Sequence, residues 1–222
     1  MQSITLRHQI VAQIRQAILD GSLGPGERVV ERTLASEIGA SVTAVREALI
    51  QLEAEGLITK RSNTTTNITS LTEDEIAQTF AVRNNLERMA VMEAAQRATA
   101  ADLRQLRALH KAAMDAASEK DPQLYVQRDF AWHEALWLAS GNRVLAATLR
   151  RLMVPLFGFS IIQTVSQKNF DLIEDSQLHT PILEAIVRKD AAAAVAAFDS
   201  AIRQWTTHVR ERPATRRRTR HA

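Results

Sequence analysis

The hydrophobic positions of residues 31–56 form two short helical patterns that are separated at Gly39-Ala40. In the second pattern, apolar residues recur at positions i, i+3, i+4 and i+7, which places them on one face of an α-helix. These residues are Val45, Ala48, Leu49 and Leu52. Ser41 is a candidate N-cap for this helix, and Gly39 suits the left-handed conformation that ends many helices. The pattern therefore predicts a helix-turn-helix.

Flanking segments extend this pattern on both sides. Residues Ile4–Asp20 carry apolar side chains near one face and predict a supporting helix. Two β-prone runs, Leu57–Arg61 and Thr66–Thr69, are separated by a turn-like stretch and predict a small hairpin, or wing, with Lys60 and Arg61 beside its tip. A helix-turn-helix pattern alone also fits two packed helices without a DNA role. The wing and the arginines together favour DNA binding.

The segments Arg32–Ala35 with Gly39, Ser41–Leu49 and Leu52–Ile58 closely resemble the winged helix of GntR-family transcription regulators. The resemblance covers the N-terminal third of the chain. It implies a DNA-contacting surface, and the wing cations are expected to join it where the family's wing tip enters the minor groove. The expected DNA-binding residues are Arg32, Ser41, Thr43, Arg46, Lys60 and Arg61.

Two positions depart from the family's usual pattern. Val42 stands where an arginine is usual, so a base or phosphate contact is expected to be missing. Thr65 stands where a glycine is usual, which puts the wing geometry in question. The operator sequence is therefore expected to differ from the family's common one.

From Leu71 onwards the composition changes to alanine- and leucine-rich helical segments. Thr72 and the acidic residues after it suit a helix N-terminus. Turn-forming residues interrupt the segment at five places. These places are near Thr99, Lys120–Pro122, Ser140–Asn142, Gln167–Asp171 and Lys189-Asp190. The sequence predicts a mainly α protein: a winged helix-turn-helix domain at 1–70 and an antiparallel all-α bundle of about six helices at 71–210.

Charge is distributed unevenly along the 222 residues. The net charge is +3, but residues 210–222 contain six arginines and one glutamate, and the rest of the chain has 22 basic and 24 acidic residues. Residues 1–69 contain seven of each sign, so DNA affinity must come from the arrangement of charges on one face. The sequence predicts a basic, disordered tail at residues 211–222. This tail either adds non-specific attraction to DNA phosphates or is a solvated end with no specific role.

Other compositional features restrict the location of the protein. The chain has no cysteine, which excludes disulfides and thiolate metal sites and agrees with a reducing cytoplasm. Its longest late apolar run, around Val154–Ile162, is too short to span a bilayer. We therefore expect a soluble, cytoplasmic protein with no membrane contact.

Asp129 and His133 lie four residues apart, so on a helix their side chains share a face. His179 and His208 lie on two other predicted helices. An aspartate with three histidines suits a divalent transition metal. Spacing alone leaves two interpretations equally open: a metal site in the bundle, or scattered histidines with separate hydrogen bonds.

A second resemblance bears on this choice. Asp129–Asn142, the stretch from His179 to Asp190, and His208 are similar to the FCD-type ligand-binding domain of the FadR subgroup of GntR regulators. The resemblance implies a divalent metal of the zinc, nickel or manganese type. Its implied ligands are Asp129, His133, His179 and His208. One departure is Pro181, which removes a backbone donor beside His179.

The resemblance also suggests effector-binding residues. Arg83 stands where the family has an arginine facing the cavity, and a guanidinium can hold a carboxylate with two hydrogen bonds. The alternative partner for Arg83 is Glu87, one turn further along. Gln204 is one turn before His208 and is expected to face the same cavity.

These features indicate a metal-dependent transcription regulator, most often a repressor in this family. As a homodimer it would place two recognition helices on a palindromic operator in double-stranded DNA, about 34 Å apart. A small carboxylate effector would bind the metal and Arg83 and change the dimer's fit to DNA.

Two other functions fit part of this pattern. The first is a metalloenzyme, since His133-Glu134 begins like the zinc-protease HExxH motif. This function is disfavoured because Trp137 occupies the position of the second histidine. A purely structural metal would stiffen the bundle without any response to small acids.

Overall fold

A computed structural model describes residues 6–19, 22–61, 65–161, 165, 167 and 169–210. Within these ranges, the side chains at positions 6, 19, 61, 158–160 and 208–210 lie outside the described part. The predicted tail at 211–222 lies outside it entirely. No helix of the described part is long and apolar enough to cross a membrane.

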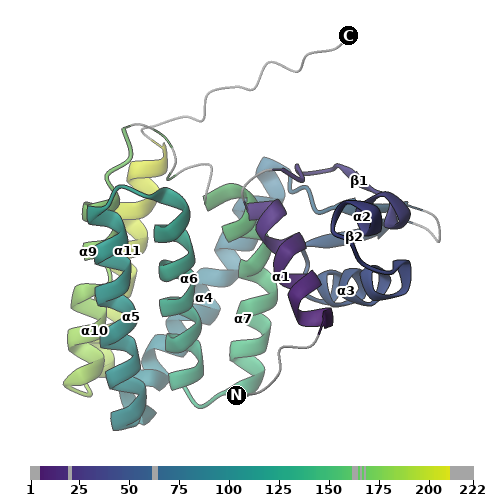
Figure 1. The fold of residues 1–222 in the computed structure, drawn as a ribbon. Helices are drawn as coiled ribbons and strands as arrows, with labels where there is room; N and C mark the ends of the chain where they lie inside the picture. The colour runs from purple at the N-terminus through teal and green to yellow at the C-terminus, as the bar shows by residue number, and fades with distance from the viewer. Residues whose placement is uncertain are drawn as a thin grey trace.

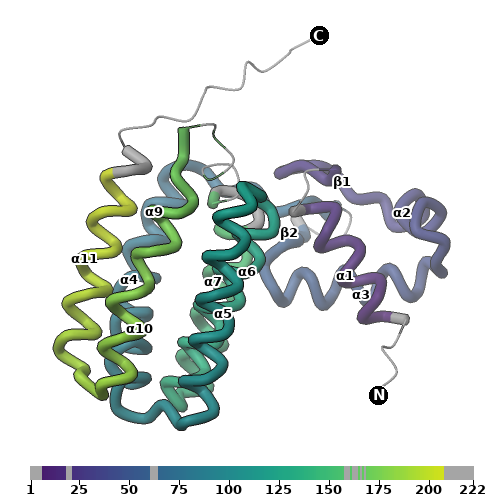
Figure 2. Tube along the Cα trace, turned by 60° about the vertical axis from the view of Figure 1, so that its left-hand side comes forward, coloured from purple at the N-terminus to yellow at the C-terminus, as the bar shows by residue number. Residues whose placement is uncertain are grey.

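The N-terminal elements form a winged helix at one side of the helical bundle (Figures 1 and 2). In chain order they are α1 (Leu6–Leu19), β1 (Arg28–Val29), α2 (Glu31–Glu37), α3 (Val42–Ala54), β2 (Ile58–Arg61) and β3 (Thr65–Ile68). The bundle follows as α4 (Glu73–Arg97), α5 (Ala100–Ser118), α6 (Pro122–Ala139), α7 (Arg143–Pro155), η2 (Leu156–Ile161), α9 (Leu172–Gln177), α10 (Thr180–Val187) and α11 (Ala191–Arg210). The predicted fold class is confirmed.

The helix-turn-helix forms for the reasons that its sequence indicates. The Ser41 hydroxyl accepts a hydrogen bond from the Ala44 amide at 3.2 Å and caps α3. Gly39 adopts φ +66° between α2 and α3, a conformation that favours glycine. The apolar face of α3 is fully buried against α1 and the wing.

The predicted wing is present and gains a third strand. β2 pairs with β3 in an antiparallel register that places Arg61 opposite Thr65, so Thr65 is accommodated as the first residue of β3. The two-residue strand β1 pairs with the other edge of β3 and was not predicted, because two residues show no alternation. The wing tip at 62–64 lies outside the described residues.

Several of the bundle helices begin at strong capping residues. Thr72 and Thr99 each form a capping box, with Glu75 and Asp102 respectively, and Asn142 caps α7. One break was not predicted: the chain turns at Leu178-His179 and divides the region between the last two expected breaks into α9 and α10.

Two prolines lie at the ends of bundle helices. Pro181 lies in the first turn of α10, where a missing amide costs no helical hydrogen bond. Pro155 ends α7, and the chain continues as the π-helix η2. Single π-turns of this kind often occur at functional sites.

The winged helix contacts the bundle along α7. Val154 packs into the N-terminal core together with the partly buried Phe130 of α6. Gly56 adopts φ +81° and approaches so closely that an added Cβ would lie 3.0 Å from Pro155 Cγ. A cavity of about 380 Å³ lies between α1 and the bundle, and Phe157 is part of its wall.

Candidate metal centre

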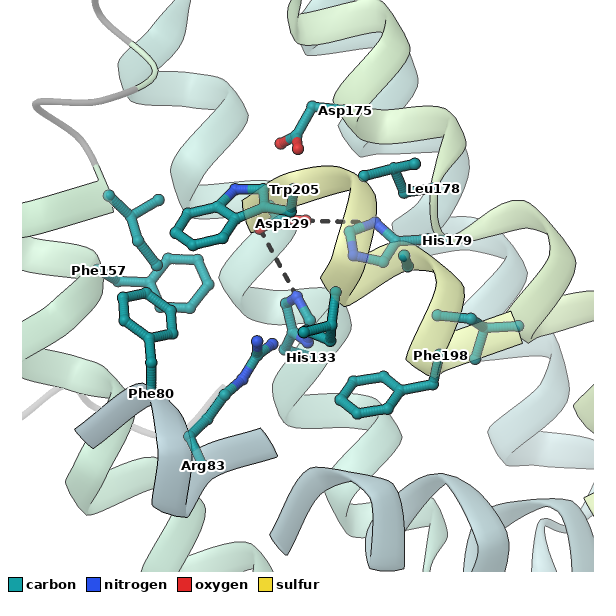
Figure 3. A pocket seen from close by; sticks show the side chains of 14 residues that line it. Phe80, Arg83, Asp129, His133, Phe157, Asp175, Leu178, His179, Phe198 and Trp205 are labelled. Atoms are coloured by element: carbon teal, nitrogen blue, oxygen red, sulfur yellow. Dashed lines mark ion pairs between the residues drawn. The ribbon is translucent and has the colours of Figure 1, made fainter. Parts of the chain in front are cut away.

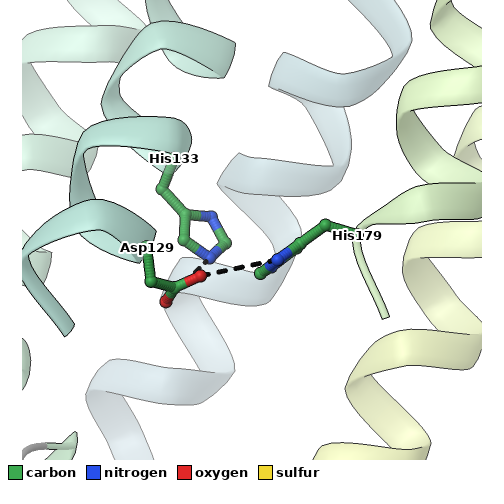
Figure 4. A group of neighbouring side chains, drawn as sticks. All are labelled: Asp129, His133 and His179. Carbon is green, nitrogen blue, oxygen red and sulfur yellow. Dashed lines mark ion pairs between the residues drawn. The ribbon is translucent and has the colours of Figure 1, made fainter. Parts of the chain in front are cut away.

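Three of the four predicted metal ligands converge in the bundle (Figure 4). Asp129 and His133 lie one turn apart on α6, and His179 lies at the turn between α9 and α10. One ligand atom from each residue lies within 4.8 Å of the other two. Asp129 Oδ1 is 3.4 Å from His179 Nδ1, and Asp129 Oδ2 is 3.8 Å from His133 Nε2. His208 belongs to α11, but its side chain lies outside the described residues.

The donor atoms of this cluster fit a metal ion. Asp129 Oδ1 and His179 Nδ1 are buried and have no hydrogen-bond partner in the described structure. Such buried orphans are costly unless another group satisfies them. Two ligands at about 2.0–2.2 Å from one ion are themselves about 3–3.6 Å apart, which is close to the observed separations. The site thus has the donor chemistry and spacing of a carboxylate–imidazole metal site.

Glu87 is a central residue of the site that sequence reasoning did not identify as such. Its Oε1 lies 2.6 Å from His133 Nδ1 and accepts a hydrogen bond from Trp137 Nε1 at 2.7 Å. Arg83 forms an ion pair with the same carboxylate. The contact fixes the His133 ring so that Nε2, rather than Nδ1, faces Asp129. The only sequence signal for Glu87 was its position one turn after Arg83.

Burial and mutual charge shift the ionisation of these groups in opposite directions. Burial alone would raise the pKa of Glu87, but Arg83 and His133 outweigh it and hold the pKa at about 2. Burial opposes protonation of His133, yet Glu87 and Asp129 raise its pKa overall. Burial, with the nearby His133, lowers the pKa of His179 well below its usual value. His179 is therefore neutral at pH 7, the form that binds a metal.

A cavity of about 60 Å³ opens beside the three ligands (Figure 3). Its aromatic walls are Phe80, Phe157, Phe198 and Trp205. Arg83 and Asp175 also line it, and Figure 3 shows them at opposite ends of the view. Burial, followed by the charge of Asp129, raises the pKa of Asp175 to about 7, although the Tyr125 hydroxyl donates a hydrogen bond to it. The cavity thus combines aromatic walls with polar groups, which are the three ligands, Arg83 and Asp175.

The two predicted effector-binding residues have different positions. Arg83 pairs with Glu87, as the second alternative expects, and it also lines the cavity, where its role in effector binding stays a prediction. Gln204 does not line the cavity; it is exposed and donates a hydrogen bond to Ser200 Oγ at 3.2 Å. The expectation that Gln204 faces this cavity is therefore wrong. The helix face that faces the cavity carries Ala201, Ile202 and Trp205, and Gln204 is about 100° away from Trp205.

His110, for which the sequence offered no partner, supports the segment that carries His179. Its Nε2 lies 2.9 Å from the Thr180 hydroxyl, and both side chains are largely shielded from solvent. Because Thr180 directly follows His179, this contact between α5 and α10 helps to fix the turn at the metal ligand.

The predicted DNA-contacting residues lie on the exposed side of the winged helix. Arg32, Ser41, Thr43 and Arg46 are exposed. Arg46 donates hydrogen bonds to Glu31 Oε2 from Nε at 3.0 Å and from Nη2 at 2.8 Å. Lys60 lies 3.2 Å from Glu53, and the Arg61 side chain lies outside the described residues. Val42 packs partly against the N-terminal core.

Comparisons with known proteins agree with both halves of this description. Residues 6–68 match the gntR family of bacterial regulatory proteins, and residues 78–204 match the FCD domain. The chain is 27% identical over 190 residues to YdhC of Bacillus subtilis, an uncharacterised HTH-type transcriptional regulator, covering 84% of this chain and 83% of that protein. It is 29% identical over 189 residues to the transcriptional repressor GlaR of Escherichia coli, covering 82% and 85%.

The fold also matches solved structures. Escherichia coli McbR/YncC superposes with a TM-score of 0.78 at 22% identity, over 92% of this chain and 97% of that one. A GntR-type regulator from Rhodococcus sp. RHA1 gives a TM-score of 0.70 at 18% identity, over 93% and 98%. These relatives are transcriptional regulators and not enzymes, which disfavours the metalloenzyme alternative.

Proposed function

Because this chain belongs to the GntR family of DNA-binding transcriptional regulators and carries an FCD domain, we propose that it is a repressor controlled by a small organic acid at a divalent metal. We place it in the FadR subgroup and in the cytoplasm, where its DNA target lies. The observation that carries the proposal is the buried Asp129–His133–His179 cluster beside a cavity, in a chain that also has a winged helix.

Residues 1–70 would bind DNA, and residues 71–210 would bind the metal and effector and form a homodimer. Support for dimerisation comes from α4, which exposes Val82, Met89 and Met92 at 40–52% of their surfaces. These residues lie seven and three positions apart and so share a face of the helix. In a symmetric dimer, two α3 helices would enter successive major grooves of a palindromic operator.

Asp129, His133 and His179 would hold the ion, with zinc, nickel or manganese as candidates. His208 is the proposed fourth ligand, because position 208 follows Ala201 by seven residues in α11 and Ala201 lines the cavity. The ion would supply positive charge that attracts a carboxylate. Glu87 would keep His133 oriented for binding.

The cavity restricts the size and charge of the effector. About 60 Å³ corresponds to roughly four to six water-sized spheres, which favours a ligand of few heavy atoms. Arg83 Nε is buried without a hydrogen-bond acceptor in the described structure. This N–H is available to an acid even though the guanidinium also pairs with Glu87.

Phe157 offers a route from the cavity to the winged helix. It lines both the metal cavity and the larger cavity beside α1. Its ring centroid is 5.8 Å from that of His133 and 4.9 Å from that of Phe130, which packs against the N-terminal core. A ligand that displaces Phe157 would therefore change how the winged helix packs against the bundle. This requires that the ligand binds with different affinity before and after the change in packing.

Selection of DNA from a random library tests this function. The purified protein should enrich a short palindrome, and one acid from a panel of small carboxylates should weaken that binding in the metal-loaded protein only. If no sequence is enriched with or without metal, the regulator proposal is wrong for this chain. If metal removal melts the protein while no acid affects DNA binding, the metal is structural.

A further inference from the structure

Tyr125 and Asp175 form a buried pair one helical turn away from the metal cluster. Tyr125 precedes Asp129 by four residues on α6, and Asp175 precedes His179 by four residues. The Tyr125 hydroxyl donates a hydrogen bond to Asp175 Oδ2 at 2.7 Å, and both side chains are buried. The pair therefore forms a second polar layer, about 6 Å along α6 from the layer that contains Asp129.

Asp175 presents an unused hydrogen-bond acceptor to the cavity. It lines the cavity, and Figure 3 shows it across the metal cluster from Arg83. Tyr125 occupies Oδ2, and within the described structure no hydrogen bond uses Oδ1. A carboxyl group keeps an acceptor lone pair whether it is ionised or neutral. An effector that reaches this end of the cavity therefore meets an acceptor that can receive a hydrogen bond from it.

We infer that Asp175 determines effector specificity by accepting a hydrogen bond from a hydroxyl or ammonium group of the bound acid. This inference rests on the proposed function, in which the effector's carboxylate is held at the metal. The effector is then a small hydroxy acid or amino acid rather than a simple alkanoic acid. A simple acid would strip water from Asp175 without replacing its hydrogen bond, and such unpaired groups give strong discrimination.

The test uses the zinc-loaded, full-length protein and calorimetric titration with acids that differ by one group. The acids are propionate, 2-hydroxypropionate, 3-hydroxypropionate, 2-aminopropionate and 3-aminopropionate. At least one donor-bearing acid should bind about tenfold more tightly than propionate. The hydroxy and amino arms identify which donor the site accepts.

Variants of Asp175 assign the preference to this side chain. Asp175→Leu should reduce the affinity ratio from about tenfold to about one, whereas Asp175→Asn should retain much of it because an amide oxygen still accepts. Glu174→Gln is the matched control, since it removes a charge from the adjacent, exposed position. Zinc content and melting temperature check folding. Asp175→Ala, which introduces no bulk, replaces the leucine variant if that variant does not fold.

The possible outcomes distinguish a failure of the Asp175 inference from a failure of the proposed function. If acids bind but the ratio is the same in Asp175→Leu as in the parent, or no donor-bearing acid exceeds propionate, Asp175 does not set specificity and the proposed function stands. If zinc binds but none of the acids does, the proposed effector class is wrong, and the inference is overturned with it.

Discussion

The winged helix and the metal cavity use charge in opposite ways. On the winged helix, Arg46 and Glu31 form an ion pair whose arginine side chain is 59% exposed. In the bundle, Arg83 and Glu87 form an ion pair that is 7% and 0% exposed. Water screens the first pair, so it contributes little to folding and its arginine is free to exchange glutamate for DNA. The second pair is costly to separate and can act as a rigid support.

Removal of the Glu87 carboxylate should have the largest effect on folding. Glu87→Ala would leave the Arg83 charge, His133 Nδ1 and Trp137 Nε1 buried without their partner. We expect the free energy of unfolding to fall by about 3–5 kcal/mol, measured by urea denaturation. Glu31→Ala removes the acid of the exposed pair and should leave unfolding nearly unchanged. Equal losses in the two variants would show that the contrast between the pairs is wrong.

Removal of the arginine from the exposed pair, by Arg46→Ala, should affect DNA binding strongly and folding hardly at all. If Arg46 contacts a base as proposed, its loss should weaken operator binding about 10- to 100-fold, because a good bidentate contact is worth about 1–3 kcal/mol of discrimination. The melting temperature should stay at the parent value, since the side chain is exposed. A fluorescence anisotropy titration with the selected palindrome measures the affinity. Retained affinity would mean that α3 is not the reading helix.

The same contrast explains what the sequence could and could not predict. The helix-turn-helix, its Ser41 cap and the Asp129–His133 pair depend on residues a few positions apart, so local periodicity predicts them. The contact between Glu87 and His133 spans 46 residues and depends on how α4 packs against α6, which periodicity does not determine. Gln204 was misplaced because its orientation was inferred from one neighbouring histidine, without the packing of α11 to fix the helix phase.

Metal binding should strengthen with pH, because a metal and a proton compete for His133. Its pKa is raised, so in the metal-free protein the ring is protonated up to a pH above 6.5. Below that folded-state pKa, zinc affinity should fall about tenfold per pH unit, as one proton is released for each ion bound. Zinc-induced stabilisation in a thermal shift series from pH 5.5 to 8 measures this trend.

Above pH 6.5, the stability of the metal-free protein should show the opposite trend. Raised pKa values favour the folded state most strongly below the unfolded pKa and lose that contribution as pH rises through the folded pKa. The stabilising contribution of Asp175 is lost between pH 3.8 and about pH 7, and that of His133 is lost above pH 6.5. Below pH 6.5 the lowered pKa of His179 acts in the other direction, because its contribution to stability grows as pH rises towards 6.5. Above pH 6.5 the chelator-treated protein should therefore lose melting temperature from Asp175 and His133 as pH rises. Parallel pH curves with and without zinc would contradict the assignment of His133 as a ligand.

Phe157→Leu should have the smallest effect and should reveal how the two regions communicate. Leucine keeps an apolar side chain in η2 but removes the ring that contacts both His133 and Phe130. Operator affinity without acid and affinity for the acid should each stay within about twofold of the parent. The acid's effect on operator affinity should fall about two- to thirtyfold, since residues between coupled sites typically alter coupling by 0.5–2 kcal/mol.

A matched control keeps this last measurement specific. Phe170→Leu makes the same change in the bundle, at a partly buried ring that packs against the core but does not line the metal cavity. It should leave the acid response intact. If both variants respond to acid like the parent, the signal does not pass through Phe157, and the contact of Gly56 with Pro155 becomes the next route to test. If both variants lose the response, general loosening of the bundle explains the effect, because coupling through one ring predicts a loss in Phe157→Leu alone.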